Sequence, residues 1–247
     1  MREQDAGLKS GASKTRGDDA MKRSMMTPLL TVLVAVLALF LWTRHAYTSA
    51  ATIIPDPAVD ETLAPQKGQE TVVVAGGCFW GIQAVFQHVK GVNSATSGYS
   101  GGTVKNPDYE QVSSGETGHA ESVEIVYDPS KITLGQLLKV FFSVAHDPTE
   151  LNRQGPDTGT QYRSAIFFSN ADQQRIAQAY VAQLDQAKVF SRPIVTQIVP
   201  FKAFYRAEDY HQNYAAEHPN NPYIATFDLP KVKNLQQQFP GLYVAGH

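Results

Sequence analysis

The order of strand-like and helix-like patterns between residues 70 and 200 constrains the fold more than any other feature of this sequence. Runs of β-branched and aromatic residues indicate strands, and apolar residues that recur every three or four positions indicate helices. Thr133 and Gln136 form a capping-box pattern that marks one helix start. The predicted elements are a strand at 71–75, a helix through residue 89, strands at 92–99 and 120–127, a helix from 133 to about 145, a strand at 162–168, a helix at 170–188 and a strand at 194–199.

This order is β-α-β-β-α-β followed by α-β, and it begins with the split β-α-β pattern of ferredoxin-like domains. The sequence therefore predicts an α+β domain with a largely antiparallel or mixed sheet that helices cover. After Pro200 the pattern weakens. One helix fits residues 207–217, and residues 220–247 are expected to form a mostly irregular tail with a turn of helix near 233–239.

The N-terminal part of the chain is predicted to lie outside the domain, which spans residues 70–247. Residues 1–23 form a polar, mildly basic tail, and residues 24–43 carry no charge and are rich in Leu and Val. At about 1.5 Å per helical residue, such a segment is long enough to cross the core of a bilayer. Residues 44–69 contain three prolines and are predicted to be a linker.

The uncharged segment has two interpretations. Trp42 at its outer end and the long polar stretch before it favour an uncleaved transmembrane anchor. Small residues at 48–51 offer a cleavage site, as expected of a signal peptide. Lys22 and Arg23 precede the segment and place the N-terminus on the cytoplasmic side. Both interpretations therefore predict that the domain lies outside the cytoplasm, either anchored on the periplasmic side or released there.

Charge and cysteine content exclude several classes of protein. The formal net charge is −2, which provides no basic field for binding nucleic acid. Cys78 is the single cysteine, so neither an intramolecular disulfide nor a metal site built from several cysteines is available. The seven histidines show no ligand spacing, and no metal site is expected. His211 and His218 are interpreted as solvated helix residues.

Cys78 lies where the first predicted strand passes through Gly76 and Gly77 into a helix. Unpaired backbone N–H groups and the helix dipole stabilise a thiolate at such a position, which predicts a reactive thiol. Phe79 and Trp80 follow at once and would form an apolar pocket beside the sulfur. The alternative is a buried, inert cysteine with two aromatic neighbours in ordinary core packing.

Glu121 is the candidate acid. It shares one face of its strand with Val123, Ile125 and Tyr127, because alternate residues of a strand point the same way. Burial on that face would favour the protonated carboxyl, which is able to act as a general acid. A solvated position at the rim of the sheet is the alternative.

Three further polar residues lie in or beside two long loops, at 100–118 and 146–160. Tyr109 and Tyr162 carry phenols that would donate hydrogen bonds, although packing or interface roles fit the pattern equally well. Asp157 lies in a Gly-Pro-Asp-Thr-Gly sequence, where a turn-forming role is the simplest interpretation.

Four segments in this order resemble the A-type peptide methionine sulfoxide reductases. They are Gly-Gly-Cys-Phe-Trp-Gly at 76–81, Gly-Tyr-Ser-Gly-Gly at 98–102, Gly-His-Ala-Glu at 118–121 and Gly-Thr-Gln-Tyr-Arg-Ser at 159–164. The resemblance covers about residues 70–218. It implies an α+β ferredoxin-like core that reduces the S epimer of methionine sulfoxide, free or in oxidised proteins, and so repairs them.

The resemblance also implies a role for each candidate residue. Cys78 matches the nucleophile, Phe79 and Trp80 the aromatic pocket for the substrate methyl group, Glu121 the acid, Tyr109 and Tyr162 the phenols that bond the sulfoxide oxygen, and Asp157 a carboxylate that orients the substrate backbone. Attack by the sulfur would leave methionine and a cysteine sulfenic acid, which a thiol must reduce.

The sequence departs from many family members, which carry further cysteines near the C-terminus that resolve the sulfenic acid. This tail has none. We therefore expect a single-cysteine cycle with no bound cofactor, in which an external thiol such as thioredoxin, glutaredoxin or glutathione reduces Cys78. Gln83 replaces a glutamate that is frequent in the family, and a structural effect only is expected of it.

Three other functions compete. A thiol peroxidase would use the same sulfenic acid, although the aromatic pair beside Cys78 favours a substrate that bears a methyl group. A papain-like protease is suggested by the spacing of Cys78 and His211, but the Cys-Gly-Ser that precedes such nucleophiles is missing. A membrane-tethered binding module would use Phe79 and Trp80 alone. Only the binding module would keep its function in Cys78→Ser.

Overall fold

This computed structural model describes residues 54–245 of the chain. The predicted tail at 1–23 and the uncharged segment at 24–43 lie outside the described residues. Within residues 54–245, every helix is too short or too polar to cross a membrane.

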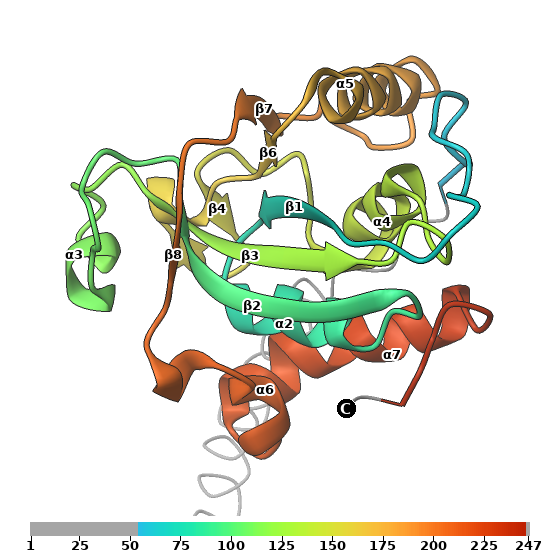
Figure 1. Cartoon of the computed structure of the whole chain (residues 1–247). Coiled ribbons are helices and arrows are strands. Elements are labelled where there is room, and N and C mark those ends of the chain that lie inside the picture. Colours follow the sequence, from blue (N-terminus) through green and yellow to red (C-terminus); the bar gives the residue numbers. More distant parts are fainter. Residues whose placement is uncertain (1–53, 246–247) are drawn as a thin grey trace, which may run out of the picture. The chain divides into compact units, whose positions relative to one another are not determined.

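One mixed sheet forms the centre of the domain (Figure 1). Its strands are β1 (Glu70–Ala75), β2 (Val92–Ser100), β3 (Ala120–Tyr127), β6 (Ala165–Phe168), β7 (Gln197–Pro200) and β8 (Phe204–Arg206). They are arranged in the order β7-β6-β1-β3-β2-β8, and β6 with β7 is the parallel pair. Because β3 lies between β1 and β2, the sheet contains the split β-α-β arrangement, and the predicted α+β domain with a mixed sheet is confirmed.

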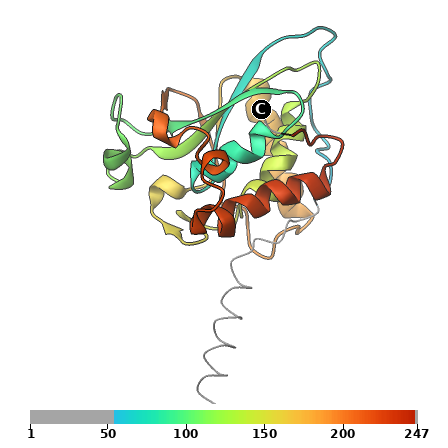
Figure 2. The ribbon, with the colours of Figure 1, turned by 90° about the horizontal axis from the view of Figure 1, so that it is seen from below.

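Helices cover the sheet and a few short elements fill the loops. The helices are α2 (Phe79–Gln87), α3 (Tyr109–Ser113), α4 (Leu134–Val140), α5 (Ala171–Gln186), α6 (Tyr214–Glu217) and α7 (Leu229–Gln238). The π-helical turns are η1 (Phe141–Ala145) and η4 (Ile224–Asp228), the 3-10 turns are η2 (Thr160–Tyr162) and η3 (Asp209–His211), and β4 (Arg153–Gln154) pairs with β5 (Asp157–Thr158). In both ribbon views α7 lies alongside α2 (Figures 1 and 2).

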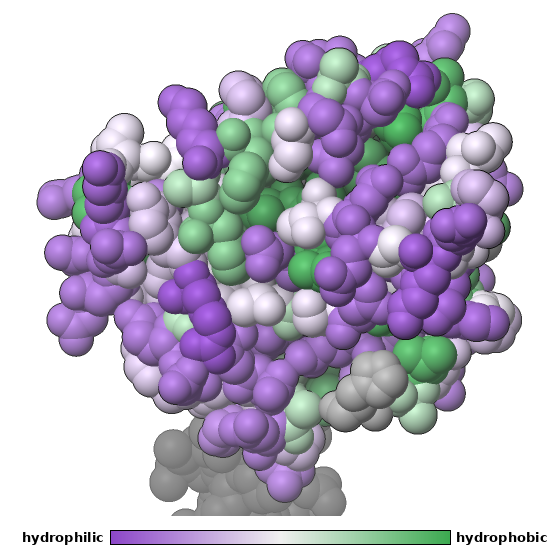
Figure 3. Space-filling model, in the orientation of Figure 1, coloured by the Kyte–Doolittle hydropathy of each residue, from purple (hydrophilic) through white to green (hydrophobic). Residues whose placement is uncertain are grey.

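The two faces of the sheet carry apolar clusters of different size. Val72 and Val74 of β1 belong to the main core, together with α2, α4 and α5. On the opposite face, Val73 and Phe167 belong to a small buried cluster, which is covered by the partly buried side chains of Val199, Phe201 and Phe204. Hydrophobic residues reach the surface on this face of the sheet in Figure 3. The catalytic candidates lie on the side of the main core.

Several predicted elements need correction after residue 160. Tyr162 lies in the 3-10 turn η2 and not in a strand. The single helix predicted for residues 207–217 is interrupted, because Asn213 adopts a left-handed conformation with φ 58° between η3 and α6. The tail is not mostly irregular, since η4 and α7 run from residue 224 to residue 238 and bury Leu235 against α2.

The described part of the predicted linker, residues 54–69, packs on the domain. Ile54 is buried in the main core. Asp60 accepts a hydrogen bond from the backbone N–H of Gly135 at 2.9 Å, and Glu61 accepts one from Leu134 at 2.7 Å. These carboxylates satisfy N–H groups at the start of α4, where the helix dipole favours negative charge. Residues 54–69 are therefore part of the domain, and we call them the N-terminal arm.

Candidate active site

The turn between β1 and α2 presents Cys78 at the N-cap of the helix. Gly77 has φ +96°, and a Cβ there would lie 2.5 Å from the Gln154 side chain. A Cβ on Gly76 would lie 2.8 Å from the ring of His146. His146 is held by its hydrogen bonds to Phe141 O and Ser164 Oγ. The two glycines are thus required for the sharp, closely packed turn that places the thiol.

Cys78 is a buried thiol and not the preformed thiolate that its helix position predicts. Burial raises its pKa well above the usual range, and the nearby carboxyls of Glu121 and Asp228 raise it further. The backbone N–H of Trp80 donates a hydrogen bond to the sulfur and lowers the pKa, as expected at the start of a helix. Desolvation has the larger effect, so the pKa is raised overall. The free site therefore holds a protonated Cys78.

Glu121 lies inside the site with its carboxyl against the start of α2. It is 3% exposed and accepts a hydrogen bond from the Phe79 backbone N–H at 3.0 Å. Desolvation raises its pKa to about 8, with smaller contributions from Asp157 and Asp228 and an opposing one from the Phe79 hydrogen bond. The predicted burial of Glu121 is confirmed, and at neutral pH its carboxyl is mostly protonated.

Tyr109 and Tyr162 come from different loops and lie close to the same two groups. The charges of Glu121 and Cys78 both act on each phenol, and burial raises the pKa of each. Both phenols therefore stay protonated and able to donate hydrogen bonds at neutral pH.

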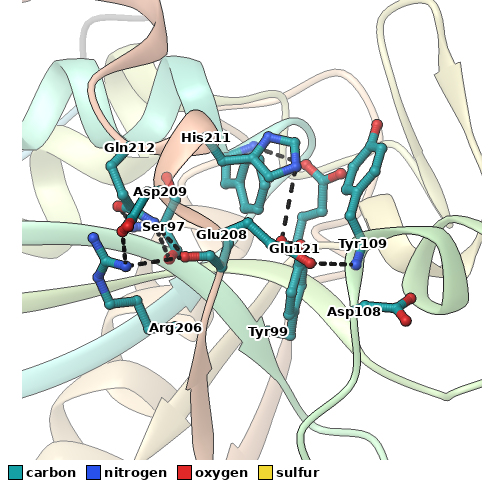
Figure 4. Close-up of polar contacts among 12 residues, drawn as sticks. Ser97, Tyr99, Asp108, Tyr109, Glu121, Arg206, Glu208, Asp209, His211 and Gln212 are labelled. Carbon is teal, nitrogen blue, oxygen red and sulfur yellow. Dashed lines mark hydrogen bonds and ion pairs between the residues drawn. The ribbon is translucent and has the colours of Figure 1, made fainter.

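Glu208 fixes the loop that carries Tyr109. One oxygen accepts the Tyr109 backbone N–H at 2.8 Å, and the other accepts the hydroxyl of buried Tyr99 at 2.8 Å (Figure 4). The side chains of Glu121 and Tyr109 reach toward the ring of His211. A carboxylate from the segment after β8 thereby holds a phenol from the β2–β3 loop in the site.

Aromatic rings form one wall of the site. The ring of Phe79, which is 1% exposed, lies 5.0 Å from the ring of His211, and Trp80 stacks on Tyr214 at 4.0 Å. The Trp80 indole donates to His211 Nδ1 at 3.2 Å. Burial lowers the pKa of His211, so its ring is neutral and able to accept this bond. His211 is therefore part of the wall, and its interpretation as a solvated helix residue was wrong.

Asp157 does more than form a turn. It lies in β5, and its carboxyl accepts the hydroxyl of Tyr223 at 2.5 Å. Burial raises the pKa of Asp157, and the Tyr223 hydrogen bond opposes that rise. The charge of Cys78 acts on Tyr223, so this pair also lies near the thiol.

Sequence reasoning missed the residues that the C-terminal segment contributes, namely His211, Tyr214, Tyr223, Asp228 and Lys231. Their spacing carries no motif, because their common position depends on how the segment after β8 returns to α2. Gln83 ties α2 to this segment through hydrogen bonds with Gln212 Oε1 and the Asn213 N–H, as its expected structural role requires. Across residues 54–245, no cluster of three or more His, Cys, Asp or Glu is arranged to hold a metal ion.

An α+β domain that buries one thiol beside a protonated carboxyl, two phenols and an aromatic wall has the groups that a thiol-dependent oxidoreductase needs. A family model described as peptide methionine sulfoxide reductase matches residues 70–241. The chain belongs to this family.

Similarity to individual proteins supports the same family. The chain is 62% identical over 185 residues to the peptide methionine sulfoxide reductase MsrA 2 of Mesorhizobium japonicum, covering 75% of this chain and 94% of that one. It is 50% identical to the MsrA of Deinococcus radiodurans over 71% of this chain and 84% of the relative. The solved methionine sulfoxide reductase A of Corynebacterium diphtheriae superposes with a TM-score of 0.55 at 35% identity, covering 70% and 89% of the two chains.

Proposed function

We propose that the protein reduces the S epimer of methionine sulfoxide, in proteins or free, with Cys78 as nucleophile and Glu121 as acid. Reduction of methionine sulfoxide follows from its family. The observation that carries the residue roles is the Phe79 N–H to Glu121 hydrogen bond, which holds a protonated carboxyl at the start of the helix that Cys78 begins.

A sulfoxide becomes reactive when its oxygen receives a proton or strong hydrogen bonds. Glu121 in its acid form donates that proton, and Tyr109 and Tyr162 donate hydrogen bonds to the same oxygen. Phe79 and Trp80 hold the methyl group on the aromatic wall, and Asp157 with Tyr223 orients the substrate backbone. Burial favours the protonated forms of Glu121, Tyr109 and Tyr162, which are the forms that donate.

The redox step involves two electrons. The Cys78 sulfur attacks the activated sulfoxide, the S–O bond of the substrate breaks, and an S–O bond forms on Cys78. Methionine sulfur is thereby reduced, and the cysteine becomes a sulfenic acid. Its hydroxyl hydrogen is the proton that Glu121 gave to the sulfoxide oxygen, and the thiol proton replaces it on Glu121. The buried thiol must lose its proton as the substrate binds, and a protonated Glu121 favours this because it adds no negative charge beside the sulfur.

The cycle closes with an external thiol because the chain has no second cysteine. One donor thiol attacks the sulfenic acid, releases water and forms a mixed disulfide. A second thiol then releases Cys78 and leaves the donor as a disulfide. A dithiol protein such as thioredoxin or glutaredoxin, or two molecules of glutathione, would supply these equivalents.

Turnover with separated epimers tests this function. With dithiothreitol as reductant, we expect the S epimer of a methionine sulfoxide peptide to disappear while the R epimer persists, and Cys78→Ser to reduce neither. Hydrogen peroxide in a parallel reaction tests the peroxidase alternative. Consumption of peroxide without reduction of either epimer would overturn the assignment.

The single-cysteine cycle is tested by omitting the reductant. One equivalent of sulfoxide should then leave one sulfenic acid per chain, which dimedone traps on Cys78 and mass spectrometry detects. Stoichiometric formation of methionine without a dimedone adduct would contradict this intermediate.

We also propose that residues 24–43 direct the domain across a membrane, as an anchor or as a cleaved signal. The support is the uncharged, Leu- and Val-rich composition of the segment after Lys22 and Arg23. An anchored protein stays in the membrane fraction at its full 27.1 kDa. A shorter protein in the periplasmic fraction indicates cleavage, and full-length protein in the cytoplasmic fraction would contradict both.

A further inference from the structure

Asp228 and Lys231 form an ion pair beneath the start of α2. Their side chains approach to 3.2 Å, the Asp228 side chain is 0% exposed and that of Lys231 is 12% exposed. The second oxygen of Asp228 is buried without a hydrogen-bond partner. Taking both charges out of water is costly, so a pair placed here demands a specific explanation.

The backbone is shaped to admit this pair. A Cβ on Gly81 would lie 2.1 Å from Asp228 Oδ1 and 2.7 Å from Lys231 Nζ. Cys78 and Gly81 are three residues apart at the start of α2, and such positions face the same side of a helix. The π-helical turn η4 ends at Asp228, where α7 begins, and it brings the carboxyl inward. The pair therefore lies one helical turn from the thiol.

The charges around Cys78 are mostly acidic. Asp228 from the start of α7 acts on the sulfur, and so does Glu121 from β3 once its carboxyl ionises. The phenols of Tyr109, Tyr162 and Tyr223 lie near enough for the charge of Cys78 to act on them. Asp157 faces Glu121 and Asp228, and neutral His146 faces Lys231. Within the described residues, Lys231 is the basic side chain that opposes these charges at the sulfur.

We propose that Lys231 is a positioning residue of the reductase site, whose ammonium stabilises the negatively charged forms of Cys78 while Asp228 holds it against α2. This inference rests on the proposed role of Cys78 as nucleophile. Asp228 has a double effect, because it fixes the ammonium and also places a negative charge near the sulfur. The two residues therefore act on the thiol in opposite directions.

Titration of the thiol in the absence of substrate tests the proposal. Cys78 is the single cysteine, so iodoacetamide alkylation against pH reports on it alone. Lys231→Met should raise the thiol pKa and slow alkylation at a fixed pH on the order of tenfold, which corresponds to one pKa unit. Asp228→Asn should lower the pKa and accelerate alkylation, and the double variant should return close to the starting value. These opposite signs would not arise from a merely structural role.

The matched control is Lys139→Met, which removes a lysine paired with Asp56 at 2.7 Å and should leave the thiol pKa unchanged. If Lys231→Met does not fold, the thiol pKa values of Asp228→Asn and of the double variant still show in which direction each charge acts. Equal shifts in the same direction, or no shift in any folded variant, would overturn the proposal. The titration needs no sulfoxide, so absence of reductase activity would refute the proposed function without deciding this question.

Discussion

At the scale of single residues, the protonation of Glu121 controls the proposed reaction. Its pKa is raised to about 8, so the acid form is present below that pH and is lost above it. We expect kcat/KM for methionine sulfoxide to fall on the basic side as Glu121 ionises. Glu121→Gln should lower kcat by roughly 10² to 10⁴ and remove this basic limb. Glu124→Gln, on the opposite face of β3, is the control and should keep the wild-type profile.

The same shift predicts how stability depends on pH. The unfolded chain releases the Glu121 proton near the usual 4.5, whereas the folded chain keeps it to about 8. Stability from this group is therefore fully present below 4.5 and lost as pH rises toward 8. In thermal denaturation, Glu121→Gln should have the same melting temperature as wild type at acidic pH. At pH above about 8 it should have a higher melting temperature than wild type. Equal melting temperatures throughout would show that Glu121 titrates normally.

His211 is expected to contribute to substrate binding through the aromatic wall. Its ring packs on Phe79 and accepts a hydrogen bond from Trp80. An aromatic contact contributes about 0.5–1.5 kcal/mol, so His211→Ala should raise KM by about threefold to tenfold with a smaller effect on kcat. Steady-state kinetics with a methionine sulfoxide peptide measure both constants. An unchanged KM would remove His211 from the substrate wall.

At the scale of elements, Asn213 decides how the segment after β8 returns to the site. Its left-handed conformation, with φ 58°, separates η3 from α6, and its side chain accepts a hydrogen bond from Gln87 at 2.7 Å. Asn213→Val should cost about 1–2 kcal/mol or more, because a β-branched residue is strained there. Asn213→Gly accepts the backbone conformation and should cost less. Denaturant unfolding compares the two, and equal losses would contradict a backbone origin.

Local sequence predicted the main strands and helices up to residue 160 well, although it missed the short α3, β4 and β5 inside the two predicted loops. The strand at 120–127 was predicted with its observed bounds, and the Thr133–Gln136 capping box is present at the start of α4. These signals are local, since they depend on side-chain alternation and on hydrogen bonds three residues apart. The elements after Pro200 are stabilised by packing on α2 and β2 and carry little periodicity of their own, so β8 and α7 were missed or underestimated.

At the scale of the whole molecule, the arm at 54–69 links the N-terminal side of the chain to the domain. Tyr180 donates its hydroxyl to Pro55 O at 2.7 Å, and Asp60 and Glu61 cap α4. A chain that begins at residue 70 should unfold at a lower temperature than one that begins at residue 54. Each lost cap contributes about 0.5–2 kcal/mol, and the kcat of the folded protein should be unchanged. Calorimetry on the two chains measures the difference, and equal melting temperatures would show that the arm does not stabilise the domain.

The sequence alone determined the α+β class, the turn that presents Cys78 and the strand face that buries Glu121. All three depend on short-range rules of backbone geometry and side-chain alternation. Only the tertiary structure decided that Cys78 is a protonated thiol, that His211 lines the aromatic wall and that Asp228 and Lys231 reach the start of α2. Burial and long-range charge depend on contacts between segments more than forty residues apart, and no local pattern records those contacts.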